Sequence, residues 1–191
     1  EKMKIILTVL VVFSLAFAQD LPGWGFYGGI GMNNAKISVS SAPSTKPLTG
    51  ILVGVSKGVM LGGMPLFVGA GLGQRGYKFD QDGVKAELSM NFFDVWMVIP
   101  YPIGPAMVWA GPGFGLFLNG KRKMEMGPFS EEEDLDEGFD EPEFGIILGG
   151  SYPLPVMDGK LNLNAGYYLG LIEHDDALTF NSIFAHLSYS L

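Results

Sequence analysis

Residues 161–171 read LNLNAGYYLGL, and apolar or aromatic side chains occupy every odd position of this stretch. The positions between them hold mainly Asn and Gly. Successive side chains of a β-strand point to opposite faces of a sheet, so a period of two places each set on its own side. The stretch therefore predicts a strand in a sheet that has one apolar face and one polar or small face.

Seven further stretches have strand character, and almost nothing in the sequence favours a helix. We expect strands at about residues 24–35, 49–60, 65–79, 84–99, 105–120, 142–153, 160–173 and 179–191. Most of these segments exceed the roughly five or six residues usual for a soluble sheet. A tilted strand needs about 9–11 residues to cross the hydrocarbon core of a membrane. Asp94 shares its parity with Phe92 and Trp96, so either a bulge shifts the phase or the interior is partly apolar there.

The connections between these segments differ in length on the two sides of the predicted sheet. The even ones, about 61–64, 100–104 and 154–158, are short and rich in Gly and Pro. The odd ones, about 36–48, 80–83, 121–141 and 174–178, include two long polar segments. This asymmetry is typical of outer-membrane barrels. We therefore predict an all-β fold, an eight-stranded antiparallel up-and-down transmembrane β-barrel with both termini on the periplasmic side.

The beginning of the chain has the three-part pattern of a secretory signal peptide. Lys2 and Lys4 precede an apolar run that is too short for a membrane-spanning helix, and Ala16-Phe17-Ala18 supplies small residues for cleavage. We expect residues 1–18 to be removed and residues 19–191 to form one barrel domain, exported to the bacterial outer membrane. The chain has no cysteine, which argues against both a lipid-anchored cysteine and a disulfide scaffold.

The composition agrees with a membrane barrel and argues against one class of partner. Hydrophobic residues make up 48% of the chain and charged residues 17%, yet no later segment has an apolar run long enough for a membrane helix. Membrane barrels interleave apolar and polar residues in this way. The net charge of −8, without any basic stripe, argues against a nucleic-acid partner.

Several short motifs resemble the PorT-like outer-membrane β-barrel family. They are FFDVWMVI at residues 92–99, AGPGFG at 110–115, EFG at 143–145 and the alternating strand that begins at Lys160. Members of this family typically have an acidic residue within an apolar strand, followed by a hairpin and a strand containing AGPG. The resemblance covers most of the chain after the signal peptide, and it implies the barrel fold without implying a particular activity.

Inward-facing polar residues form the first candidate site. Arg75, Asp94, Glu143, Lys160 and His186 fall at or near interior parity, together with Asn162, Asn164, Ser188 and Ser190. Side chains just fill the interior of an eight-stranded barrel, and charges there must pair or stay hydrated. We expect a hydrogen-bonded plug that holds the barrel closed, with a proton or ion pathway as the alternative.

The long acidic connection forms the second candidate site. It contains Glu131, Glu132, Glu133, Asp134, Asp136, Glu137, Asp140 and Glu141. A charge run is usually a solvated loop, although carboxylates also suit divalent cations or a cationic partner. At its base, Lys121-Arg122-Lys123 could bind lipid phosphates or serve as counter-charges for the loop.

Several functions remain open from the sequence. The leading hypothesis is a structural or surface-interaction barrel, without catalysis or cofactor, whose partners are outer-membrane lipid, lipopolysaccharide and an extracellular or periplasmic protein. A narrow pore and a soluble periplasmic ligand-binding barrel are alternatives. His186 and Ser188 could in principle serve as a base and a nucleophile, but no oxyanion motif accompanies them.

Overall fold

The computed structural model describes residues 23–37, 45–81, 83–135, 142–174 and 178–191. Within these residues the chain forms nine strands and one short 3₁₀ segment, η1. The strands are β1 (Trp24–Ile37), β2 (Lys46–Leu61), β3 (Met64–Gln81), β4 (Val84–Ile103), β5 (Ala106–Met126), β6 (Phe129–Leu135), β7 (Glu143–Pro153), β8 (Leu161–Gly170) and β9 (Leu178–Ser190), and η1 (Met157–Gly159) precedes β8. No helix in this part of the chain is long and apolar enough to cross a membrane.

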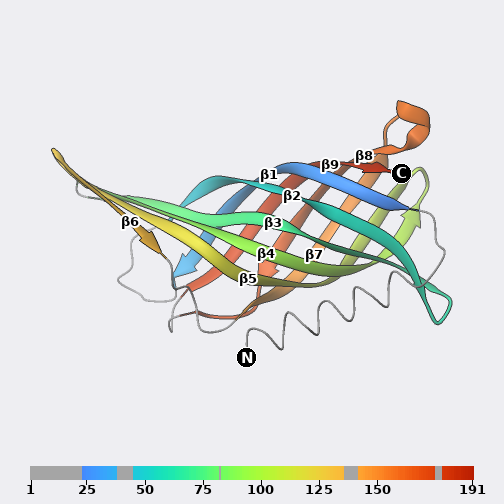
Figure 1. Ribbon diagram of the computed structural model, residues 1–191, viewed down its shortest axis with the longest axis horizontal. Helices are drawn as coiled ribbons and strands as arrows, with labels where there is room; N and C mark the ends of the chain where they lie inside the picture. The colour runs from blue at the N-terminus through green and yellow to red at the C-terminus, as the bar shows by residue number, and fades with distance from the viewer. Residues whose placement is uncertain (1–22, 38–44, 82, 136–141, 175–177) are drawn as a thin grey trace.

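Eight of the strands close into a ring. Figure 1 shows the resulting barrel from the side. Each strand pairs antiparallel with its neighbour along the chain, except that β5 passes over β6 to pair with β7. The ring closes where β1 pairs with β9, from Gly25 opposite Ser190 to Ile37 opposite Leu178. This arrangement confirms the predicted eight-stranded antiparallel barrel. The predicted signal peptide lies outside the described residues and stays a prediction.

The apolar side chains point outward. Ile51, Ile30 and Ile183 are each more than half exposed, and many Leu and Val side chains of the wall are similarly exposed. On β8 the predicted alternation is present, because Leu163 and Leu169 face outward whereas Asn164 and Tyr168 are buried. An apolar exterior suits lipid contact. A soluble ligand-binding barrel needs the opposite arrangement, so the wall argues against that alternative.

The interior at β4 is partly apolar. This was one of the two explanations offered for the shared parity of Asp94, Phe92 and Trp96; the other was a bulge that shifts the phase. A register shift between β4 and β5 falls at Asn91 and Phe92. Beyond the shift, Phe92 is 1% exposed, and the indole of Trp96 hydrogen-bonds the Tyr27 hydroxyl across the interior. Asp94 therefore shares the inner face with two aromatic residues.

The connection predicted at 121–141 is wrong for residues 121–135, because this segment continues the sheet. β5 runs on to Met126, and β6 returns alongside it with Lys121 opposite Asp134 and Lys123 opposite Glu132. Opposite charges directly across a strand pair stabilise it, and Gly127 adopts the positive φ of +58° that the tight turn needs. We call residues 120–135 the projecting hairpin; Figure 1 shows it extending well beyond the ring.

Candidate functional site

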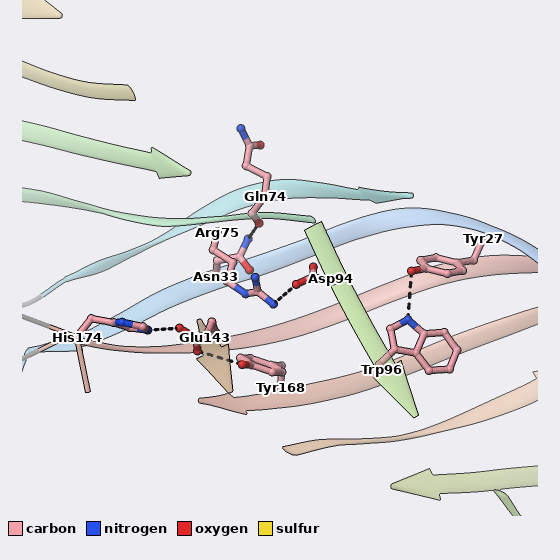
Figure 2. A network of polar contacts seen from close by, with 9 residues as sticks. All are labelled: Tyr27, Asn33, Gln74, Arg75, Asp94, Trp96, Glu143, Tyr168 and His174. Carbon is pink, nitrogen blue, oxygen red and sulfur yellow. Dashed lines mark hydrogen bonds and ion pairs between the residues drawn. The ribbon is translucent and has the colours of Figure 1, made fainter. Parts of the chain in front are cut away.

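The two ends of the barrel differ, and we name them by their connections. The turn end carries the short connections at 62–63, 104–105 and 154–160, together with Trp24 and Ser190. The loop end carries the projecting hairpin and the connection between β8 and β9. Figure 2 shows the network of polar side chains in the interior at close range.

An ion pair spans the middle of the barrel interior. Arg75 Nη2 on β3 donates to Asp94 Oδ1 on β4 at 2.7 Å, and Arg75 is only 8% exposed. The guanidinium also lies over the rings of Phe92 and Tyr168, at 4.6 and 4.9 Å from their centroids. Aromatic faces attract a desolvated cation, so three neighbours together stabilise the Arg75 charge.

A second polar group lies toward the loop end. Glu143, the first residue of β7, has 0% exposure. Its Oε1 accepts a hydrogen bond from the Tyr168 hydroxyl at 3.0 Å, and its Oε2 lies 2.7 Å from Nε2 of His174. His174 lies in the connection after β8, where its backbone pairs with Leu178. Glu143 therefore joins two barrel strands to a connection at the loop end.

A compact apolar cluster fills the interior next to this polar group. Ala35, Met90, Phe92 and Phe180 are each 2% exposed or less, and Phe92 contacts Phe117 and Phe180 edge to face. The cluster comes from β1, β4, β5 and β9, so it reaches across the barrel. Among the described residues, the cluster therefore occupies the part of the interior toward the loop end with packed apolar side chains.

The structure brings together some of the predicted interior residues and not others. Arg75, Asp94 and Glu143 lie in one network that Tyr168 completes. His186 lies nearer the turn end, where its ring is 5.2 Å from that of Tyr27. Lys160 is exposed at the C-terminal end of η1, so its predicted interior position is wrong because the 154–160 turn carries it out of the barrel.

Sequence reasoning missed His174, Tyr168 and Asn33 as members of the interior network. Asn33 Nδ2 donates to the carbonyl of Gln74 at 2.8 Å, which ties β1 to β3. Tyr168 and Asn33 occur at interior parity and could have been found from it. His174 lies in a connection, and no periodic signal marks its inward direction.

Ser188 and His186, which the sequence offered only as an alternative nucleophile and base, make no hydrogen bond to each other in the structure. Ser188 Oγ accepts a hydrogen bond from Asn164 Nδ2 at 3.0 Å. Nδ1 of His186 is buried without a hydrogen-bond partner among the described residues. This geometry contains no activating contact between the two side chains and offers no support for nucleophilic chemistry.

The projecting hairpin carries its charges as cross-strand pairs. Lys121 Nζ lies 2.7 Å from Glu132 Oε1 and 3.5 Å from Asp134 Oδ1, and Arg122 pairs with Glu133. Lys123 Nζ lies 2.7 Å from Glu125 Oε1 on its own strand. Lys121 and Arg122 therefore supply counter-charges for the acidic strand, which was one of the two roles expected for the basic triplet, whereas Lys123 pairs within β5.

These exposed pairs shift the ionisation of their members. The hydrogen bond from Lys121, together with its charge, lowers the pKa of Glu132, and the same contact raises the pKa of Lys121. Lys123 likewise lowers the pKa of Glu125. Glu131 faces the same solvent, but no cation pairs with it among the described contacts.

The divalent-ion hypothesis gains no support from the described part of the acidic segment. No group of three or more His, Cys, Asp or Glu side chains in the described ranges is arranged to hold a metal ion. Asp136, Glu137, Asp140 and Glu141 lie outside the described residues, so their predicted role stays a prediction.

Together, the closed ring, the apolar exterior and the polar interior define a small outer-membrane β-barrel. A family model described as outer membrane protein beta-barrel domain matches residues 17–176. The chain belongs to this family.

Comparison with known proteins agrees with this class. Neisserial surface protein A is similar, with a TM-score of 0.56 and 12% identity over 88% of this chain and 97% of that chain. Ail, the attachment invasion locus protein of Yersinia pestis, has a TM-score of 0.52 and 11% identity over 89% of this chain and 99% of that chain. At these identities the likeness shows a shared fold alone. None of the curated proteins matches the sequence.

Proposed function

We propose that the protein is a surface-interaction barrel whose projecting hairpin binds an extended, positively charged polypeptide outside the cell. In this proposal the turn end faces the periplasm and the loop end faces outward. Outer-membrane lipid and lipopolysaccharide surround the barrel, and the protein works without catalysis or cofactor.

The observation that carries the proposal is the outer edge of β6. In the described residues β6 pairs with β5 alone and ends the strand order of the sheet. An edge strand presents a row of backbone donors and acceptors to which another chain can add. The side chains of β6 are nearly all exposed, so no other described element covers them.

The charge of the hairpin indicates which chain would add. The projecting hairpin, residues 120–135, contains five acidic and three basic side chains, and Glu131 to Asp134 are consecutive on the edge strand. A basic extended segment would meet four consecutive acidic residues on β6, Glu131 to Asp134, and Glu131 has no ion-pair partner among the described contacts, which favours association. Acidic side chains on the edge also discourage pairing between two copies of this chain.

The interior argues against a pore as the main function. The apolar cluster around Phe92 and Phe180 closes the loop end among the described residues, and the ion pair of Arg75 and Asp94 crosses the middle. An eight-stranded barrel has little further space for a solute path.

The proposal includes two more specific assignments, one to a group within the family and one to the route of export. The motifs at 92–99 and 110–115 support a PorT-like member of the family, and the pattern of residues 1–18 supports export through a cleaved signal peptide. N-terminal sequencing of protein isolated from outer membranes should begin at Gln19. A start at residue 1 would contradict the cleavage.

Binding to a defined peptide tests the docking proposal. The barrel in lipid nanodiscs should bind an alternating Lys-Thr peptide, and replacing residues 122–133 with an Asn-Gly turn should abolish binding while leaving a compact, heat-modifiable barrel. The two-residue turn suits this cut because Lys121 and Asp134 are direct partners.

Two controls separate strand addition from simple charge attraction. A peptide of the same charge with alternate backbone amides methylated cannot extend a sheet, so it should not bind. Glu87→Gln, on β4 of the same sheet, should leave peptide binding unchanged, whereas Glu131→Gln should weaken it. Equal binding of the methylated peptide, or binding that survives removal of the hairpin, would show the proposal to be wrong.

A further inference from the structure

The interior toward the turn end holds a cavity that the plug does not fill. It has a volume of about 440 Å³ and extends from Arg75 and Asp94 to Gly23, Gly159 and Ser190 at the turn end. Among the described residues, the apolar cluster lies beyond Arg75 toward the loop end and does not line the cavity. An apolar cavity of about 150 Å³ can hold benzene. The space here suffices for a molecule with two fused rings.

Aromatic rings line this cavity in a continuous series, which we call the aromatic collar: Trp96, Tyr27, His186, Phe184 and Trp109. Tyr27 lies 6.0 Å from Trp96 and 5.2 Å from His186 between ring centroids. The Phe184 ring is nearly parallel to those of His186 and Trp109, at 5.9 and 6.2 Å. The rings come from β4, β1, β9 and β5, so they surround the space.

Glycines on the remaining strands make room for these rings at the wall. A Cβ at Gly166 of β8 would lie 2.7 Å from both Phe184 and Trp109, and one at Gly69 of β3 would overlap the Trp96 indole. Because the rings occupy the volume that side chains would take on β3 and β8, the centre of the barrel remains open. The collar therefore lines the cavity without filling it.

The charges near the cavity are already balanced, which limits the kind of ligand. Arg75 and Asp94, the Arg and Asp side chains of the lining, pair with each other. The other polar groups of the wall are neutral, among them Asn164, Ser188 and Ser56. A charged ligand would lose its hydration here without gaining a counter-charge, and that loss is costly. A neutral planar ring can stack on the collar and hydrogen-bond the neutral groups.

We propose that this cavity binds uncharged molecules of one or two aromatic rings that carry a hydroxyl or amide group and enter from the turn end. The collar supplies the stacking surface, and Asn164 and Ser188 supply hydrogen bonds near the entrance. The site is separate from the projecting hairpin, so it does not depend on the proposed surface function.

Calorimetric titration of the full barrel in phosphatidylcholine nanodiscs with 2-naphthol tests the site, with empty nanodiscs correcting for partitioning into lipid. We expect saturable binding with one site per chain. Ser188→Phe places a ring in the cavity and should weaken binding at least tenfold. Ala185→Phe, on the outward face of the same strand, should leave the affinity within twofold of the original.

Titrations with further variants and with charged ligands test the same site if Ser188→Phe does not fold. If Ser188→Phe does not give a heat-modifiable barrel, Phe184→Ala should weaken binding at least fivefold, whereas Phe26→Ala on the exterior should not. 2-Naphthalenesulfonate and a naphthyl trimethylammonium salt should bind at least tenfold more weakly than 2-naphthol. Binding no greater than that of empty nanodiscs, equal binding by the inward variants, or tighter binding of either ion would overturn the proposal.

Discussion

The interior of the barrel and the projecting hairpin both contain ion pairs, but the surroundings of these pairs differ. The side chains of Arg75 and Asp94 are 10% and 21% exposed, whereas those of Lys121 and Glu132 are 62% and 53% exposed. Both pairs have a closest N–O distance of 2.7 Å. The two pairs have the same N–O distance but contribute differently to stability, because water screens the outer pair and not the inner one.

This difference has a structural consequence for each region. Around Arg75, two aromatic rings and a carboxylate surround the cation, so removing one partner leaves a buried charge without compensation. In the hairpin, water can replace a lost partner at once. We therefore expect the interior network to contribute to the stability of the barrel and the hairpin pairs to contribute mainly to local order and partner choice.

The largest effect should come from breaking the interior ion pair on one side. Arg75→Met should lower the free energy of unfolding by about 3–5 kcal/mol, because Asp94 then remains buried and unpaired. Urea-induced unfolding of the barrel in lipid vesicles, followed by tryptophan fluorescence, measures this change.

The matched control removes both charges at once. Arg75→Met combined with Asp94→Leu should recover most of the lost stability, because a pair of apolar side chains can replace a buried ion pair at little cost. A double variant as unstable as Arg75→Met alone would show that packing of the guanidinium on Phe92 and Tyr168 matters more than its charge.

A smaller effect should follow from loss of the contact at the loop end. His174→Ala leaves Oε2 of Glu143 without its partner at 0% exposure, and an unsatisfied buried acceptor costs about 1–3 kcal/mol. The same unfolding assay should show a loss in this range. Glu173→Ala changes the exposed neighbour and should leave the stability unaltered. Equal effects of the two substitutions would contradict a specific role for His174.

The barrel itself was predictable because its signals are local. Alternation along residues 161–171 needs only the period of a strand, and the short Gly and Pro connections indicate which ends of the strands meet. Arg75, Asp94 and Glu143 were found for the same reason, since interior parity is a property of each strand. The structure adds that these three side chains lie in one network.

The missed features depend on contacts that no local pattern contains. Residues 121–135 of the connection predicted at 121–141 proved to be paired strands, in which Lys121 and Arg122 pair with acidic residues that alone resemble a solvated run. His174 contacts Glu143 from 31 residues away, within a connection that has no parity. The aromatic collar was not predicted either. Its side chains come from four strands and lie near one another only because the barrel closes.

The smallest effect we predict concerns the hairpin pairs and depends on pH. The folded-state pKa of Glu132 lies below its ordinary value of 4.5, so its pairing stabilises the hairpin above that pH and is lost as the pH falls through the lowered value. The pKa of Lys121 is raised above 10.5, so the same pair persists from neutral pH upward and is lost only as the pH rises through the raised value.

Amide hydrogen exchange in β6, corrected for intrinsic rates, should therefore become less protected on acidification from neutral to below 4.5, while amides of the barrel strands change less. Lys121→Gln should make the protection of β6 amides depend less on pH. Salt near 1 M should have the same effect as this substitution, because the screening length falls to about 3 Å. Protection in β6 that stays constant with pH in the original protein would mean that backbone pairing with β5, rather than the charges, holds the hairpin in place.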